Sequence, residues 1–146
     1  DFVDWGNADN YVKAVGVGEC AGVVIDLVAT LLLEAKDKLT FAHEAFEENK
    51  WSDAIYHAYA GFVNGAKALL LSENQKTNHQ AGIIDLFDTV FVETNKISFE
   101  TSFRDLVFQI NKNEPTEAFA KKYIEQAIHF FDTIEAFRAK DLRDEK

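Results

Sequence analysis

The sequence predicts an all-α fold, an antiparallel up-and-down bundle of four main helices plus one short helix, with an irregular N-terminal arm. Apolar residues recur with the 3.6-residue period of a helix in every segment after residue 20. The chain has only 1 Pro and 7 Gly, so few residues interrupt these segments. No alternating strand of useful length follows residue 20. The 146 residues fit one domain, which we divide into an arm over residues 1–19 and a bundle over residues 20–143.

The first helix is expected from Cys20 to about Glu48. Asp26, Thr30 and Glu34 recur every four residues and form one narrow polar stripe on an otherwise apolar helix. Such a helix is expected to be buried over most of its circumference. Asn49 and Lys50 follow as the turn.

The second helix is expected from Trp51 to Leu71. Small residues recur along it three or four positions apart, namely Ala54, Ala58, Gly61, Gly65 and Ala68. Small side chains at this spacing let a neighbouring helix approach closely.

Three further helices complete the predicted bundle. The third covers about His79 to Glu93, and the short fourth begins at a Ser98 cap and ends near Asn111. The last runs to about Leu142, with Pro115 in its first turn, where the missing N–H of proline matters least.

Composition excludes several classes of protein. A formal net charge of -10 argues against binding to phosphate backbones, so we expect no nucleic-acid partner. The longest apolar stretch, Cys20 to Leu33, is too short to span a bilayer, so we expect a cytoplasmic protein without membrane contact. The single Cys forbids an internal disulfide framework and a multi-cysteine metal or cluster site. The chain has no Met, which indicates a processed chain or one cut from a longer protein.

Two charged motifs are candidates for chemistry. Arg104 and Asp105 stand among Phe residues of the short helix, where they would either recognise a ligand carboxylate or phosphate or form a structural pair. Asp53 and His57 are four residues apart, as are Glu125 and His129, and both pairs are predicted to be surface ion pairs.

The run WSDAIYHAYAGFVNGAKALL, from Trp51 to Leu70, resembles the second helix of HEPN domains. His79 leading into Phe91 is similar to the third helix of that family, and Ala118 to Phe137 is similar to its final helix. Arg104 and Asp105 stand roughly where the family often has an Arg and an Asp. The resemblance covers about residues 23–140 and implies a HEPN-like bundle.

Catalytic HEPN ribonucleases carry an Arg that is followed four to six residues later by a His. None of Arg104, Arg138 and Arg143 has a His at that distance. The resemblance therefore implies a domain that is not catalytic by itself, and it weighs against a toxin-like nuclease.

The segment GVGECAGVVIDLVATL, from Gly16 to Leu31, resembles the C-terminal helical extension of bacterial ferredoxin-type sulfite/nitrite reductases, together with Asp4-Trp5 and Tyr11 to Val15. This resemblance implies a parent chain that is an oxidoreductase with sirohaem and an iron–sulfur cluster, whose core would be a partner in the same chain. The cluster-binding pairs Cys-x5-Cys and Cys-x3-Cys are absent, so no cofactor is expected in this domain.

Together these resemblances predict a non-catalytic HEPN-like accessory domain of a sulfite/nitrite reductase chain, which serves packing, dimerisation or partner docking. The alternative is a stand-alone HEPN-type module that binds a nucleotide or small ligand near Arg104. The candidate ligand or partner contacts are Arg104, Asp105, His57, Tyr56 and Tyr59, and no catalytic, cofactor-binding or metal residue is assigned.

A homodimer is expected through the second helix, which is nearly apolar all round. Its aromatic and small residues would form the contact, namely Tyr56, Ala58, Tyr59, Gly61, Phe62 and Gly65. The alternative is that this helix is central in its own bundle and surrounded by its own chain.

Overall fold

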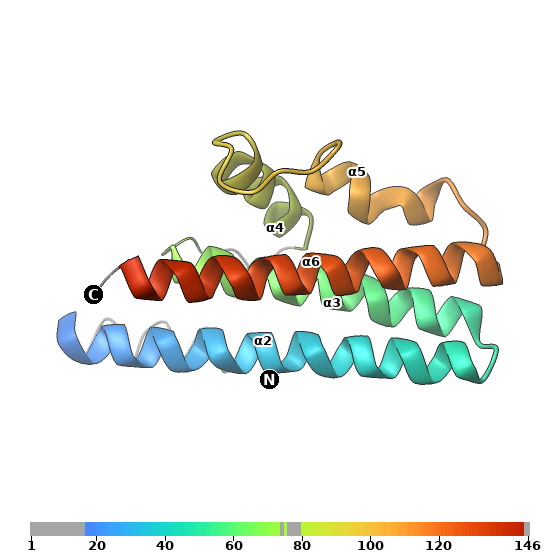
Figure 1. The fold of residues 1–146 in the computed structure, drawn as a ribbon, viewed down its shortest axis with the longest axis horizontal. Helices are drawn as coiled ribbons and strands as arrows, with labels where there is room; N and C mark the ends of the chain where they lie inside the picture. Colours follow the sequence, from blue (N-terminus) through green and yellow to red (C-terminus); the bar gives the residue numbers. More distant parts are fainter. Residues whose placement is uncertain (1–16, 74, 76–79, 145–146) are drawn as a thin grey trace.

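The structure is a computed structural model that describes residues 17–73, 75 and 80–144 (Figure 1). Its α-helices are α2 (Val17–Glu47), α3 (Trp51–Ser72), α4 (Gln80–Phe87), α5 (Phe103–Val107) and α6 (Glu117–Asp144). A π-helical turn, Asp88–Val92, extends α4, and a 3-10 turn, Phe108–Asn111, extends α5. Every regular element in these residues is helical, which confirms the all-α prediction. Residues 1–16 of the predicted arm lie outside the described part of the chain, and residues 17–19 begin α2.

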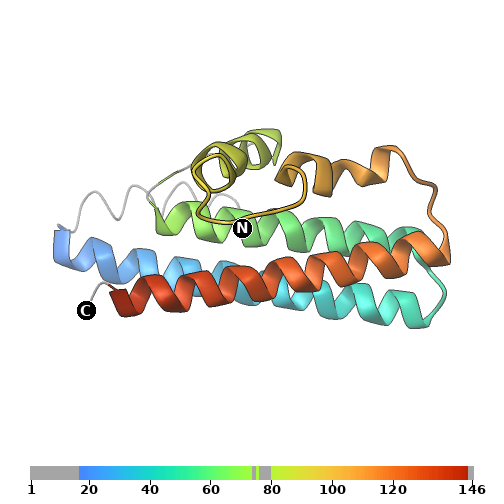
Figure 2. The same cartoon turned by 45° about the horizontal axis from the view of Figure 1, so that its top comes forward.

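Three long helices form the frame of the fold. α2 and α3 pair as an antiparallel hairpin, and α6 lies along both of them (Figures 1 and 2). α6 runs opposite to α2 and in the same direction as α3, because the segment between α3 and α6 returns the chain to the far end (Figure 2).

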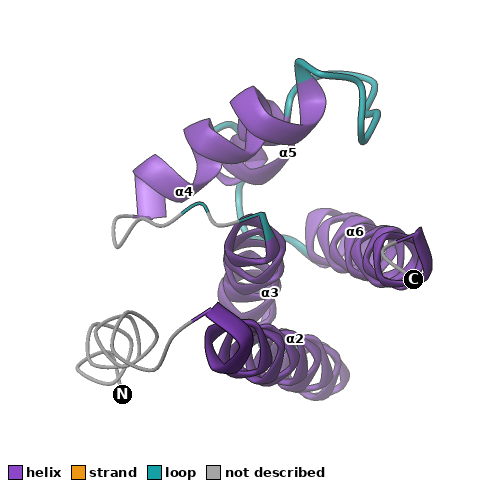
Figure 3. Cartoon of the chain, turned by 90° about the vertical axis from the view of Figure 1, so that its left-hand side faces the viewer, coloured by secondary structure: helices purple, strands orange, loops and turns teal. Residues whose placement is uncertain are grey.

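The α4–α5 segment covers the frame on the side away from α2 (Figure 3). α4 packs on α3 and lies across the long helices rather than along them (Figures 1 and 3). The third predicted helix, about His79 to Glu93, is not a single long α-helix. The π-helical turn at Asp88–Val92 interrupts its α-helical winding.

The turn between α2 and α3 occurs where the sequence predicted it. Asn49 has a φ of 64°, in the left-handed region that Asn tolerates better than most residues. Just beyond the turn, the Trp51 ring packs on Phe46 with 5.1 Å between centroids. This contact closes the end of the hairpin.

A cluster of phenylalanine rings joins α3, α4, α5 and α6. Phe62, Phe87, Phe103 and Phe130 are all fully buried. The Phe87 and Phe103 centroids lie 4.5 Å apart, and those of Phe103 and Phe130 lie 4.8 Å apart. Each such aromatic pair adds about 0.5–1.5 kcal/mol beyond the burial of its area.

The small residues of α3 pack against the protein's own helices. A Cβ atom added at Gly61 would lie 2.9 Å from Leu39 Cδ2 of α2, and one at Gly65 would lie 3.3 Å from Ile134 Cδ1 of α6. Phe62 and Ala58 are fully buried as well. The predicted dimer surface is therefore wrong for these four residues, since α3 is the central helix and the frame already occupies its small-residue faces.

Two helix starts differ from the prediction. Ser102, not Ser98, caps α5, because its Oγ accepts a hydrogen bond from the Asp105 N–H at 3.0 Å. α6 begins at Glu117 rather than Pro115, and Thr116 Oγ1 accepts a hydrogen bond from the Phe119 N–H at 3.2 Å. In both cases a side-chain hydroxyl that accepts a backbone hydrogen bond determines where the helix begins.

Candidate functional site

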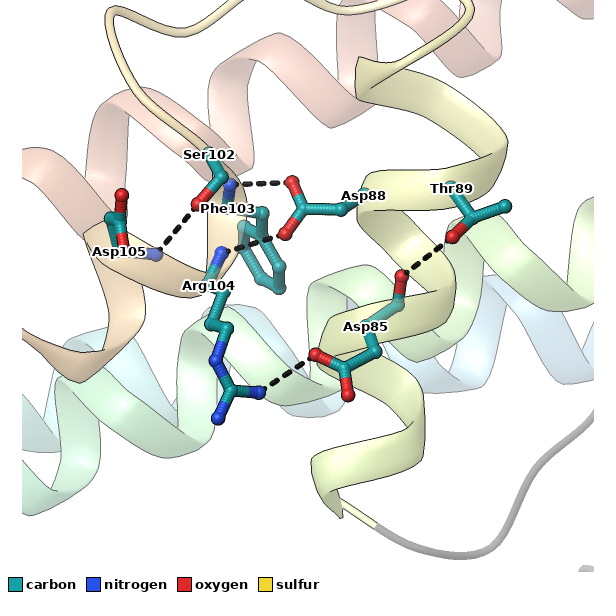
Figure 4. A network of polar contacts seen from close by, with 7 residues as sticks. All are labelled: Asp85, Asp88, Thr89, Ser102, Phe103, Arg104 and Asp105. Atoms are coloured by element: carbon teal, nitrogen blue, oxygen red, sulfur yellow. Dashed lines mark hydrogen bonds and ion pairs between the residues drawn. The ribbon is translucent and has the colours of Figure 1, made fainter.

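A polar network surrounds Arg104 and joins the π-helical turn to α5 (Figure 4). The Asp88 carboxylate accepts two hydrogen bonds from backbone N–H groups, one from Phe103 at 2.7 Å and one from Arg104 at 3.0 Å. These N–H groups belong to the first turn of α5, where no helical carbonyl is available to them. Asp88 therefore holds α5 against the end of α4.

The charge of Arg104 already has a partner within the chain. Its Nη1 donates a hydrogen bond to Asp85 Oδ1 at 2.7 Å (Figure 4), and its Cζ lies 5.0 Å from the centre of the Phe108 ring. Both side chains of the ion pair are about half exposed. In the described residues Arg104 pairs with Asp85 rather than with the neighbouring Asp105.

This geometry gives Arg104 a structural role. The backbone N–H of Asp105 completes the cap of α5, and the residue lines the groove described below. Ligand binding by Arg104 remains a prediction. A ligand there would bind a guanidinium that already forms an ion pair with Asp85.

A second candidate is a group of rings on α2 and α3, which we call the aromatic surface: Phe41, Tyr56 and His57. The His57 ring lies 5.7 Å from Phe41 and 5.6 Å from Tyr56, both in edge-to-face geometry. Tyr56 is 63% exposed and Phe41 is 44% exposed. Lys38 Nζ lies 5.9 Å from the centre of the Phe41 ring. Two predicted contact residues, Tyr56 and His57, thus lie together. Phe41, which was not among the predicted contacts, joins them.

His57 is buried at one atom of its ring. Nδ1 is covered and has no hydrogen-bond partner among the residues that the structure describes. The predicted ion pairs of His57 with Asp53 and of His129 with Glu125 are also not formed in the described residues. By contrast, His43 Nε2 lies 3.9 Å from Glu47 Oε2. Leaving a covered polar atom without a partner costs free energy. Since no hydrogen bond holds Nδ1, the His57 side chain is positioned by its ring contacts with Phe41 and Tyr56.

Tyr59, the remaining predicted contact, lies deeper in the fold. It is half-buried and packs against the main core, and this burial raises the pKa of its hydroxyl. Tyr123 is more deeply buried, its hydroxyl donates to the Val107 carbonyl at 2.7 Å, and burial raises its pKa further. Tyr59 therefore offers less area to a partner than Tyr56 does.

A groove of about 890 Å³ lies between residues 98–112 and α6. Phe99, Leu106 and Phe130 supply apolar lining, and charged and amide side chains line the rest. Gln109 Nε2 donates to Gln126 Oε1 at 2.8 Å and so connects the two walls. The sequence does not reveal this groove, because residues 17 positions apart carry no local pattern that indicates their contact.

The described residues show neither a metal-binding cluster nor a membrane-spanning helix. No group of three or more His, Cys, Asp or Glu side chains there is arranged to hold a metal ion. None of the helices in that part of the chain combines the length and the apolar character needed to cross a bilayer.

Comparison with known proteins identifies the family. The HEPN domain family matches residues 28–137. A protein of Methanocaldococcus jannaschii named "Putative toxin MJ0605" is 31% identical over 115 residues, which cover 73% of this chain and 85% of that protein. No solved structure matches the chain. The helical fold and these matches agree, and the chain belongs to the HEPN domain family.

Proposed function

We propose that this HEPN domain acts by binding rather than by catalysis, and that it pairs with a second copy of itself through the aromatic surface. The observation that carries the proposal is the exposure of Tyr56 and Phe41, whose rings flank His57 on the outside of α2 and α3. Exposed aromatic side chains grouped in this way are typical of the centres of protein interfaces.

Two features support a non-catalytic role. The Arg–His spacing of catalytic HEPN ribonucleases is absent from the sequence. Arg104, on the helix where the resemblance expects an Arg, is paired with Asp85 and lies over Phe108. An arginine that already forms an ion pair and packs on a ring is poorly suited to bind the phosphate of a substrate.

A second copy is the favoured partner because the surface suits a two-fold contact. In such a contact the same patch meets itself, so the rings of one copy pack on the rings of the other. Lys38 lies beside Phe41, and Asp53 stands one helical turn before His57, so both signs of charge border the surface.

The predicted attachment to a sulfite/nitrite reductase has no support from the comparisons, since neither match is a reductase. The proposal therefore does not include a reductase core. The cytoplasmic location and the absence of nucleic-acid partners and of a bound cofactor stay predictions.

Sedimentation equilibrium at tens of micromolar protein tests the pairing. We expect a dimer for the wild type, which tightens as salt rises because two copies of charge -10 repel each other. Tyr56→Ser should be monomeric. The control, Ile128→Ser, removes another exposed large apolar side chain, from α6, and should leave the dimer intact. A wild-type species of 16.5 kDa at low and at high salt would refute the pairing.

A second candidate function comes from the relative of M. jannaschii, whose name describes a toxin. A toxin would slow growth when the chain is expressed, whereas a binding module without activity would not. Induced expression in a bacterial host, with growth followed against an empty vector, separates the two. Growth arrest by the wild type that Tyr56→Ser does not relieve would favour the toxin.

A further inference from the structure

The groove between residues 98–112 and α6 carries opposite charges at its two ends. The Gln109–Gln126 hydrogen bond fixes the register of its walls, and the chain runs in opposite directions along them (Figure 2). Lys112 and Lys122 therefore lie toward one end, while Asp105 lies toward the other. No ion pair within the described residues involves any of these three side chains.

Two other ionisable side chains line the wall formed by α6. Glu125 stands three residues after Lys122, and His129 stands one turn further. Glu100 adds a carboxylate from the loop before α5. The positive charge is thus confined to the lysine end, and the carboxylates extend over the rest of the groove.

The middle of the groove presents an amide donor and an amide acceptor. Gln109 Nε2 donates one hydrogen to the Leu106 carbonyl at 2.8 Å and the other to Gln126 Oε1 at 2.8 Å. A carbonyl only accepts, so this contact fixes which end of the Gln109 amide is nitrogen. Gln109 Oε1 and Gln126 Nε2 are left without a partner in the described residues, and neither atom is covered.

Phe99 and Leu106, which are half-buried, give the groove apolar surface beside these polar groups, and Phe130 adds a small part of the lining. Phe130 is 1% exposed and is fixed by the phenylalanine cluster, so this part of the lining is rigid. A ligand that matches the groove combines apolar side chains, a central amide, and a negative and a positive group at its two ends.

We propose that the groove binds a free peptide of about three residues in an extended conformation. Its carboxylate lies between Lys112 and Lys122, its ammonium group lies at Asp105, and its amides contact Gln109 and Gln126. Along the α6 wall, His129 lies seven residues after Lys122, a rise of about 10 Å, and three extended residues span about the same length. The site lies on α5 and α6, away from the aromatic surface, and does not depend on the proposed pairing.

Binding of trialanine to the whole chain tests the proposal, by calorimetry or by NMR shifts of the Gln109 and Gln126 side-chain amides. We expect trialanine to bind and Lys122→Glu to weaken its binding about tenfold, because the variant removes one charge-assisted hydrogen bond to the peptide carboxylate. The matched control is Lys121→Glu, which makes the same charge change at an exposed neighbour outside the groove and should leave the affinity within about twofold.

Two blocked peptides test the two ends separately. Trialanine amide lacks the carboxylate, and N-acetyl-trialanine lacks the ammonium group, so both should bind about tenfold more weakly. Equal binding of the acetylated peptide would instead point to the carboxyl terminus of a protein and would overturn the assignment of a free peptide. Absence of binding at millimolar trialanine, or equal loss in Lys121→Glu and Lys122→Glu, would overturn the site itself.

Discussion

The three-helix frame and the α4–α5 segment are held in place by different forces. In the frame, α3 meets its neighbours through small residues, with Gly61 under Leu39 and Gly65 against Ile134 and Phe130. In the α4–α5 segment, Asp88 caps α5 and Asp85 pairs with Arg104, in addition to the phenylalanine contacts (Figure 4). The frame depends on close packing, and the orientation of the short helices depends on a few directional polar contacts.

Because of this difference, we expect the two regions to respond differently to substitution. Close packing of buried side chains tolerates little change in volume. Polar contacts at a partly exposed site contribute less, because water competes for the same groups. We therefore expect the largest losses of stability in the frame and graded, smaller losses in the α4–α5 network.

The largest expected effect comes from filling the α3–α6 contact. Gly65→Leu places a branched side chain where even a Cβ atom lies 3.3 Å from Ile134 and Phe130, so overpacking should cost about 1–3 kcal/mol. Urea denaturation measures the loss. Ala136→Leu on the exposed side of α6 serves as the control and should change stability by less than about 0.5 kcal/mol. Equal stability of the two variants would mean that α3 and α6 are not packed as described.

The next largest effect on stability is expected at Asp88, and it should exceed the effect at Asp85 in the same network. Asp88→Ala leaves two backbone N–H groups of α5 without their acceptor and should cost about 1–2 kcal/mol. Asp85→Ala removes an exposed ion pair and should cost about 0–1 kcal/mol. Hydrogen exchange at the amides of Phe103 and Arg104 should accelerate in Asp88→Ala only. Acceleration in both variants would assign the cap to the ion pair instead.

A pH-dependent effect tests the tie between α5 and α6. The folded state raises the pKa of Tyr123 above its ordinary value of 10.0, so above this pH the unfolded chain loses a proton that the folded chain keeps. Stability should then fall with rising pH, by up to about 1.4 kcal/mol per pH unit from this one group. Tyr123→Phe should cost about 1 kcal/mol at neutral pH through loss of the bond to Val107, and its stability should fall less steeply above pH 10.0. Parallel pH profiles of the two proteins would contradict the burial of Tyr123.

The frame could be predicted from the sequence, while the network could not. Periodicity placed α3 within one residue of its observed Trp51–Ser72 bounds, because burial of an apolar helix is encoded locally. The bonds from Asp88 to Phe103 and Arg104 join residues 15 and 16 positions apart, and no local pattern specifies them. The periodicity also does not reveal the π-helical turn at Asp88–Val92, for which the sequence offers no signal.

The candidate surfaces show the same limit. Tyr56 and His57 were recognised from their place on α3, but Phe41 joins them only because α2 and α3 pair as a hairpin. The small-residue spacing on α3 was interpreted as an outer surface, although it serves the contacts with α2 and α6. Spacing predicts that something packs closely there, and it does not tell whether the neighbour belongs to the same chain.

The smallest effect on folding is expected at the aromatic surface, where Tyr56→Ser should change stability by less than about 0.5 kcal/mol while it abolishes pairing. Denaturation and sedimentation of the same sample check both parts. A loss of stability as large as that of Gly65→Leu would assign Tyr56 to the core.

Photo-cross-linking tests the pairing most directly. A photoreactive phenylalanine analogue replaces Phe41 in one protein and Ile128 in another, two positions of similar exposure on different helices. If the aromatic surface pairs two copies, irradiation should give a band at twice 16.5 kDa from the protein labelled at position 41, and this band should strengthen with salt. The protein labelled at position 128 should stay monomeric on the gel. No dimer band from position 41, or bands of equal strength from both positions, would contradict pairing through this surface.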